Sequence, residues 1–315
     1  MLGKEIDSAG LKASYDAACK KLLANKVILA WIMKSCLEEY RNCSVQDIAE
    51  RYIEGEPQIA QTAVHPDEGA ELIRGASTED STIHEGSVTY DIRFYALAPI
   101  SGELISLIIN VEAQNDFYPG YPVIKRGIYY GSRMISSQYG KEFTESHYEK
   151  IKKVYSIWIC MDPPEYRKNT INRYSIQEEC LAGNVKENPA NYDLLTAVMI
   201  CLGDTGKETQ TSILKLLEVL LSSDREADEK KRILQEEFAI RMTRALESEV
   251  SVMCNLSKGV EEKGIAKGVA RGIAQGVLFS IRKLMDSTKW TEEQAMDALQ
   301  IPEADREKYR EELKK

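Results

Sequence analysis

Two runs of strand-forming residues on either side of a turn signal constrain this chain more than any other feature. The runs, 89–98 and 104–114, flank Ser101-Gly102, and this arrangement predicts an antiparallel hairpin. Alternation of period two gives that hairpin one wholly apolar face. The face carries Ile92, Phe94, Ala96 and Ala98 together with Ile105, Leu107, Ile109, Val111 and Ala113. We therefore expect a sheet with one face buried against other elements.

The opposite face of the hairpin carries polar side chains that suggest a metal site. A hairpin centred on Ser101-Gly102 pairs Asp91 directly with Glu112, and Gln114 follows on the same side. Directly opposed Cβ atoms lie about 4.5–5.5 Å apart. Two carboxylates at that separation repel each other unless a cation lies between them. The alternative is a pair of acidic residues that solvent tolerates on the wet face of a half-exposed sheet.

An aspartate on one strand and Glu-x-Gln on the next resemble the PD-(D/E)XK nuclease superfamily. The wider pattern resembles its recombination-promoting nuclease and transposase branch. It comprises Asp16 with Lys20, Asp91, Glu112-x-Gln114, Arg126-x-x-Tyr129-Tyr130 and the strand 154–159. The resemblance covers roughly the first half of the chain, and a glycine-repeat tail is also similar to that branch. It implies a restriction-endonuclease-like core sheet flanked by helices, and Mg²⁺-dependent cleavage of DNA during recombination or transposition of mobile elements.

That resemblance assigns roles to the hairpin residues. Asp91 and Glu112 would ligate Mg²⁺, or Mn²⁺ as an alternative, through carboxylate oxygens, and Ala113 through its carbonyl. The superfamily's usual lysine is Gln114 here, a variant that this branch also uses. A neutral amide can only orient the attacking water or donate a hydrogen bond to the phosphate. A cation at the attacking water is therefore not provided by this motif.

The charge distribution bears on DNA binding. The net charge of −9 opposes a simple DNA binder, because phosphate contacts need lysine and arginine. The stretch 121–153 nevertheless has 7 basic and 3 acidic residues, and it directly follows the hairpin. Within it, Lys125 and Arg126 are the predicted phosphate-binding residues. A solvated helix face is the other interpretation of this basic stretch.

Periodicity predicts an α/β fold followed by an all-helical C-terminal half. We expect a nuclease-like domain over 1–185, a helical region over 186–257, and a glycine-repeat helix with a terminal helical hairpin over 258–315. The expected details are helices over 14–37 (with a break near Asn25), 123–139, 194–202 and 213–221, a polar loop over 55–87, and a strand over 154–160.

On the first of these helices, Asp16 and Lys20 share a face. An ordinary i,i+4 ion pair is one interpretation of this spacing. In the other, the helix contributes a group to the metal site.

Glycines recur every fourth residue at Gly264, Gly268, Gly272 and Gly276. Each costs a helix about 1 kcal/mol relative to alanine, so the row needs a compensating reason. Close approach of another helix is one such reason. The approach occurs either between chains, giving a homo-oligomer through 258–280, or within one chain.

Cysteine usage and hydropathy indicate a cytoplasmic protein. The chain has 7 cysteines, an odd number, and no Cys-x-x-Cys, which fits reduced thiols better than disulfides or a zinc site. No uncharged stretch is long enough to span a bilayer, so no membrane partner is expected. The expected partner is DNA. A different class of function is also open, in which a non-catalytic nuclease-fold adaptor binds DNA or protein partners through its helical half.

Overall fold

The computed structural model describes residues 2–59, 79–82, 86–99, 104–112, 117, 120–204, 212–222 and 224–313. They divide into two compact units, 1–257 and 258–315. The first unit is a mixed sheet packed against helices, and the region from 213 to 313 is helical apart from its connections. The expected α/β class is therefore confirmed as a mixed sheet packed against helices and followed by a helical C-terminal region.

The main sheet of the described residues has six strands in the order β1-β4-β5-β6-β8-β7. Its strands are β1 (Ile53–Ile59), β4 (Ile92–Leu97), β5 (Leu104–Glu112), β6 (Val154–Cys160), β7 (Thr170–Ser175) and β8 (Leu195–Cys201). The pairs β5/β6 and β6/β8 are parallel, and the outer pairs are antiparallel. A separate ribbon pairs β2 (Glu79–Thr82) with β3 (Gly86–Thr89).

The helices are α1 (Leu2–Leu23), α2 (Lys26–Cys36), α3 (Val45–Asp47), α4 (Val123–Ser136), α5 (Ser212–Leu221), α6 (Ala227–Glu236), α7 (Arg244–Thr288), α8 (Glu292–Ala298) and α9 (Glu303–Leu313). The expected break between the first two is confirmed. Asn25 caps α2, because its side chain accepts a hydrogen bond from the Val27 amide at 3.0 Å.

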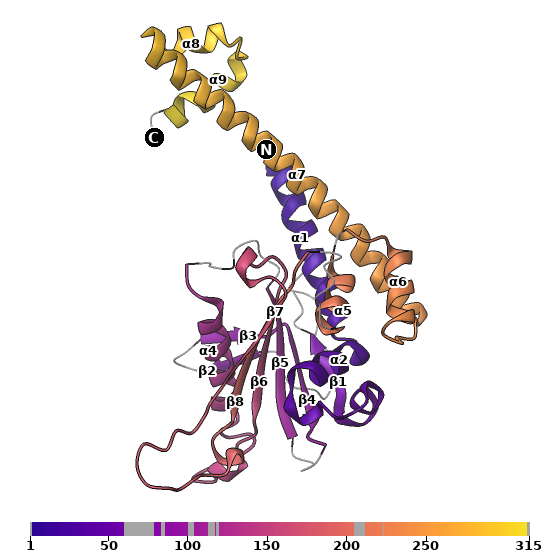
Figure 1. Ribbon diagram of the computed structural model, residues 1–315. Coiled ribbons are helices and arrows are strands. Elements are labelled where there is room, and N and C mark those ends of the chain that lie inside the picture. Colours follow the sequence, from indigo (N-terminus) through magenta and orange to yellow (C-terminus); the bar gives the residue numbers. More distant parts are fainter. Residues whose placement is uncertain are drawn as a thin grey trace. The chain divides into compact units, whose positions relative to one another are not determined.

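The first unit has hydrophobic contacts on both faces of the sheet. One face packs on α1, α2 and α5, where Ile92, Phe94 and Ile105 join the main core. The other face packs on α4, where Trp158 and Met199 lie with Val123. Figure 1 shows α4 on one side of the sheet and α2 with α5 on the other. Strand β6 is buried along its whole length because helices cover both of its sides.

Two expectations about secondary structure were wrong. The apolar run 194–202 forms β8, not a helix, so the helical region expected to start at 186 begins only after this strand. A short apolar run fits a doubly buried strand as well as a helix, and β8 is such a strand. The polar loop expected over 55–87 contains most of β1 and also β2 and β3.

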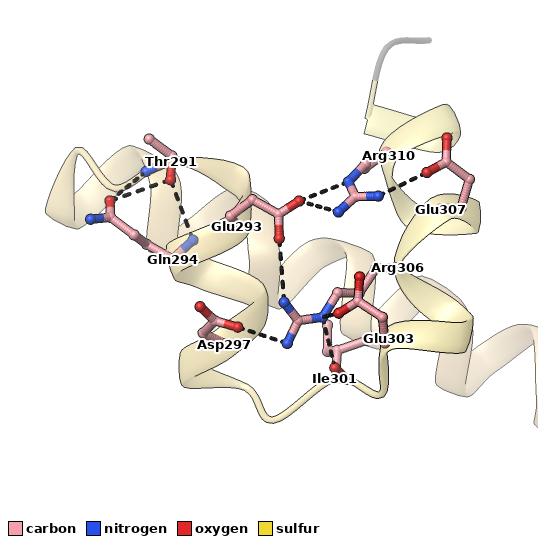
Figure 2. A network of polar contacts seen from close by, with 9 residues as sticks. All are labelled: Thr291, Glu293, Gln294, Asp297, Ile301, Glu303, Arg306, Glu307 and Arg310. Atoms are coloured by element: carbon pink, nitrogen blue, oxygen red, sulfur yellow. Dashed lines mark hydrogen bonds and ion pairs between the residues drawn. The ribbon is translucent and has the colours of Figure 1, made fainter.

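In the second unit, the C-terminal part of α7 packs with α8 and α9. Ile281, Met296, Ile301 and Tyr309 are its buried core. An ion-pair network covers one side of the two terminal helices (Figure 2): Arg306 contacts Glu293, Asp297 and Glu303, and Arg310 contacts Glu293 and Glu307. The arginines therefore neutralise several carboxylates of this acidic hairpin, which was expected as two short helices.

The buried thiols of the first unit predict how its stability depends on pH. Burial raises the pKa of Cys19 and of Cys36 from 9.0 to about 12. The unfolded chain releases these protons near pH 9 while the folded chain keeps them. The contribution of these protonated thiols to the free energy of unfolding is complete below pH 9. It is lost as the pH rises toward 12, by about 1.4 kcal/mol per pH unit for each thiol.

We therefore expect the free energy of unfolding to fall between pH 9 and about 11. Urea unfolding at several pH values measures the slope. Cys36→Ala should make the fall shallower, and substitution of the exposed Cys180 by alanine is the matched control. Equal slopes for wild type and Cys36→Ala would contradict the prediction.

Candidate functional site

The carboxyl ends of the parallel strands carry the predicted site residues. Glu112 ends β5 and pairs with Cys160 at the end of β6. Because β4 runs antiparallel to β5, the bend that holds Asp91 just before β4 lies toward the same end of the sheet. The crevice at the carboxyl ends of parallel strands is where open α/β sheets bind ligands.

Lys20 of α1 joins two carboxylates at this end of the sheet. Its Nζ lies 2.6 Å from Asp16 Oδ2 and 2.9 Å from Asp91 Oδ1. Asp16 and Lys20 are one helical turn apart, so both point toward the start of β4. The Lys20 side chain is only 11% exposed, while Asp91 is 21% exposed and Asp16 33%. The pair expected within α1 is confirmed. Its extension to Asp91 agrees with the alternative in which the helix contributes a group to the site, although the contact itself was not predicted.

The two carboxylates keep Lys20 charged. Burial lowers the pKa of Lys20, but the hydrogen bond to Asp16 and the negative charge of Asp91 outweigh it, so its pKa lies above the usual value. A permanent cation therefore compensates both acids. No sequence pattern signals this arrangement, because Asp91 is remote from α1 along the chain.

The direct pairing of Asp91 with Glu112 was wrong. Ile92 pairs with Ile109, whereas a hairpin centred on Ser101-Gly102 would pair it with Val111. The register is therefore displaced by two residues, and Asn110 is the next position opposite Asp91. A shift of two residues leaves every side chain on its own face, so alternation could not detect it. The apolar face is confirmed for the side chains that the structure describes, since Ile92, Phe94, Ala96 and Ile105 are buried in the core.

The remaining site predictions fall partly outside the described structure. Glu112 is described through its backbone alone, and Ala113 and Gln114 lie outside the described residues. Convergence of Glu112 with Asp91 stays a prediction.

The two predicted phosphate-binding residues differ in their surroundings. Lys125 is exposed in the first turn of α4. Arg126 is partly buried, with its Cζ 5.1 Å from the ring centre of Tyr130 and 5.3 Å from that of Trp158. Its guanidinium also donates hydrogen bonds to the Tyr130 hydroxyl at 3.2 and 3.0 Å. Arg126 thus packs α4 against the sheet, and Lys125 is the more accessible of the two.

The described oxygen donors suit a hard cation only in part. Asp16 and Asp91 supply carboxylates of the type that Mg²⁺ prefers, and both already face a cation, the Lys20 ammonium. No group of three or more His, Cys, Asp or Glu side chains that could hold a metal occurs among the residues described. The side chain of Glu112 is not among those described, so its part in such a site stays a prediction.

Comparison with protein-family models, curated proteins and solved structures found no match to this chain. Within the described part of the chain, no helix combines the length and the apolar character needed to cross a bilayer.

Proposed function

We propose that this protein is a metal-dependent DNA endonuclease that hydrolyses phosphodiester bonds. The observation that supports it most is the Lys20 ammonium held between Asp16 and Asp91 at the carboxyl end of the sheet. It provides a cation next to the acid that the resemblance assigns to the metal. Association with recombination or transposition rests on the resemblance alone.

A restriction-endonuclease-like core is the finer fold that we propose. The antiparallel pair β4/β5, the helix α4 and the parallel strand β6 follow one another as such a core requires. Helices on both faces of the sheet agree with it.

In the proposed mechanism, Asp91, Glu112 and the Ala113 carbonyl would hold Mg²⁺, or Mn²⁺ as an alternative. The chemistry supplied by the bound ion is activation of a water and neutralisation of charge on the scissile phosphate. Lys20 acts as a positioning residue that fixes the Asp91 carboxylate through its 2.9 Å ion pair. Gln114 orients the attacking water or donates a hydrogen bond to the phosphate, and Lys125 contacts the DNA backbone.

Plasmid nicking tests this function. Wild-type protein should convert supercoiled DNA to open circles with Mg²⁺ or Mn²⁺, and EDTA should stop the reaction. A parallel assay on RNA of the same sequence defines the substrate class. Absence of cleavage of both substrates with either metal would reject the nuclease proposal.

A non-catalytic adaptor is the second candidate. It is favoured by the net charge of −9. Such a protein would bind DNA or a protein partner through its helical half. It should leave plasmid DNA uncut with either Mg²⁺ or Mn²⁺, which separates it from the nuclease.

We also propose that α7 associates with a second copy of itself through 258–280. A Cβ added to Gly268, Gly272 or Gly276 meets no described atom within 4 Å. The neighbouring Val269 and Ile273 are 57% and 62% exposed. The described structure thus gives these glycines no intramolecular helix partner, and such an open row allows close approach of another backbone.

Substitutions at the glycines distinguish a dimer from a free helix. Gly268→Leu with Gly272→Leu should block close approach and reduce the mass measured by light scattering. On a free helix, alanine at the same positions would raise helix stability by about 1 kcal/mol each and leave the mass unchanged. A higher melting temperature for the alanine variant, with wild-type mass for both variants, would contradict self-association.

A further inference from the structure

Arg167 lies at the same end of the sheet as the proposed metal site. It ends the short 3₁₀ turn η4 (Glu165–Arg167), which follows β6, and the last residue of β6 pairs with Glu112. Its Cζ lies 5.9 Å from the ring centre of Phe117, in the segment that follows Glu112. Phe117 in turn packs against the cluster that contains Cys160 at the end of β6 and Val123 at the start of α4. Arg167 and Lys125, which is in the first turn of α4, thus lie at the same end of the sheet.

Arg167 and its neighbour Lys168 differ in whether their positive charge is neutralised by carboxylates. Lys168 forms ion pairs with Glu165 at 2.9 Å and with Asp204 at 2.6 Å. Arg167 forms no ion pair with any acidic side chain in the described part of the chain. Hydrogen bonding to the Tyr174 side chain holds its pKa above the usual value, so it is always charged. One turn therefore carries a compensated and an uncompensated cation.

Aromatic rings surround the uncompensated guanidinium. Its Cζ lies 5.8 Å from the ring centre of Tyr166, whose residue surface is 69% exposed. A guanidinium backed by Phe117 and flanked by an exposed tyrosine presents a charged group for a phosphate and a flat ring for a base or sugar. This combination is typical of surfaces that follow a nucleic-acid backbone.

We propose that Arg167 binds a backbone phosphate of the DNA strand that enters the Asp91 site, with Tyr166 contacting the adjacent nucleotide. This inference rests on the proposed nuclease function and adds a phosphate contact that does not belong to the hairpin or to α4.

Fluorescence anisotropy with a labelled DNA duplex in EDTA tests the contact without cleavage. Arg167→Ala should weaken binding about tenfold and make the salt dependence of log Kd shallower by about one unit between about 50 and 200 mM salt. Arg167→Lys should lie between this variant and wild type, because it keeps the charge but loses the planar fork. Lys168→Ala is the matched control: it removes a charge from the same turn, but one already paired, and it should bind within about twofold of wild type.

Three results would overturn the contact. Wild-type affinity in Arg167→Ala, at an unchanged melting temperature, rejects it while leaving the nuclease proposal intact. Equal losses for Arg167→Ala and Lys168→Ala show that only the general positive field matters, which also rejects it. Wild-type protein that neither binds nor nicks DNA rejects the nuclease function and this contact together.

Discussion

Replacing Asp91 with asparagine should reduce Mg²⁺-dependent nicking by about 100-fold or more, because a neutral amide is a much weaker ligand and charge partner than a carboxylate. Glu112→Gln should do the same, and Gln114→Ala should have a milder effect. Initial rates of plasmid relaxation at saturating Mg²⁺ measure the loss. Asp193→Asn is the matched control, since Asp193 is ion-paired to Lys153 at 2.7 Å and is 26% exposed. Full activity in Asp91→Asn would show that another acid does the work.

The same substitution also tests the electrostatics of the site. Two opposed carboxylates would repel, and removing one would then raise the melting temperature. In the structure Asp91 contacts the Lys20 ammonium instead, so Asp91→Asn removes an attraction. We therefore expect a slightly lower melting temperature for this variant.

Lys20→Met should lower the turnover number by about tenfold to 100-fold and change KM for DNA little. Without the ammonium, Asp16 and Asp91 lose their shared partner, and Asp91 is no longer held in one orientation. Binding of Mn²⁺, followed by electron paramagnetic resonance, should be at least as tight as in wild type, because a competing cation is gone. Lys20→Arg should recover part of the rate.

The control for Lys20 is its neighbour. Lys21→Met removes an exposed lysine of the same helix, whose Nζ lies 3.4 Å from Glu249 Oε1 of α7, and it should leave turnover unchanged. Equal turnover in Lys20→Met and wild type would exclude the positioning role. A loss of Mn²⁺ binding in Lys20→Met would show that Lys20 supports the fold of the site instead.

For the β4/β5 hairpin, sequence patterning predicted which side chains face the core better than it predicted which residues pair across the two strands. Alternation placed Ile92 and Ile105 on one buried face, and both join the core. It could not fix the register, because a displacement by two residues preserves every face. The turn signal at Ser101-Gly102 was the only guide, and the ladder that pairs Leu97 with Leu104 centres the hairpin one residue earlier.

Burial on both sides explains why β8 was mistaken for a helix. A strand between β6 and β7 with helices on both faces needs no polar positions, so Thr196 is the only polar residue in it. Its apolar run therefore has no period of two to recognise. For β1, the polar residues Glu54 and Glu56 and the breakers Gly55 and Pro57 hide a strand at the edge of the sheet.

The site itself was predicted only as far as its motif. Asp91 was identified from its expected pairing with Glu112, which the register contradicts, and the spacing of Asp16 and Lys20 gave their common helix face. The contact between Lys20 and Asp91 depends on how α1 packs against the sheet, which no local pattern contains. Arg167 belongs to no sequence motif. It stands out only in the structure, where Lys168 pairs with two carboxylates and Arg167 pairs with none among the residues described.

The main core joins residues from both ends of the first unit, and this affects how the chain can fold during synthesis. Cys19 of α1 contacts Met253 of α7, with the sulfur atoms 3.8 Å apart, and β8 completes the parallel strands beside β6. The apolar faces of α1 and α2 therefore leave the ribosome long before their partners exist, a delay on the order of tens of seconds at common elongation rates. A chaperone that holds these two helices until α7 emerges should raise the yield of folded protein, whereas truncation near residue 185 should leave an insoluble fragment.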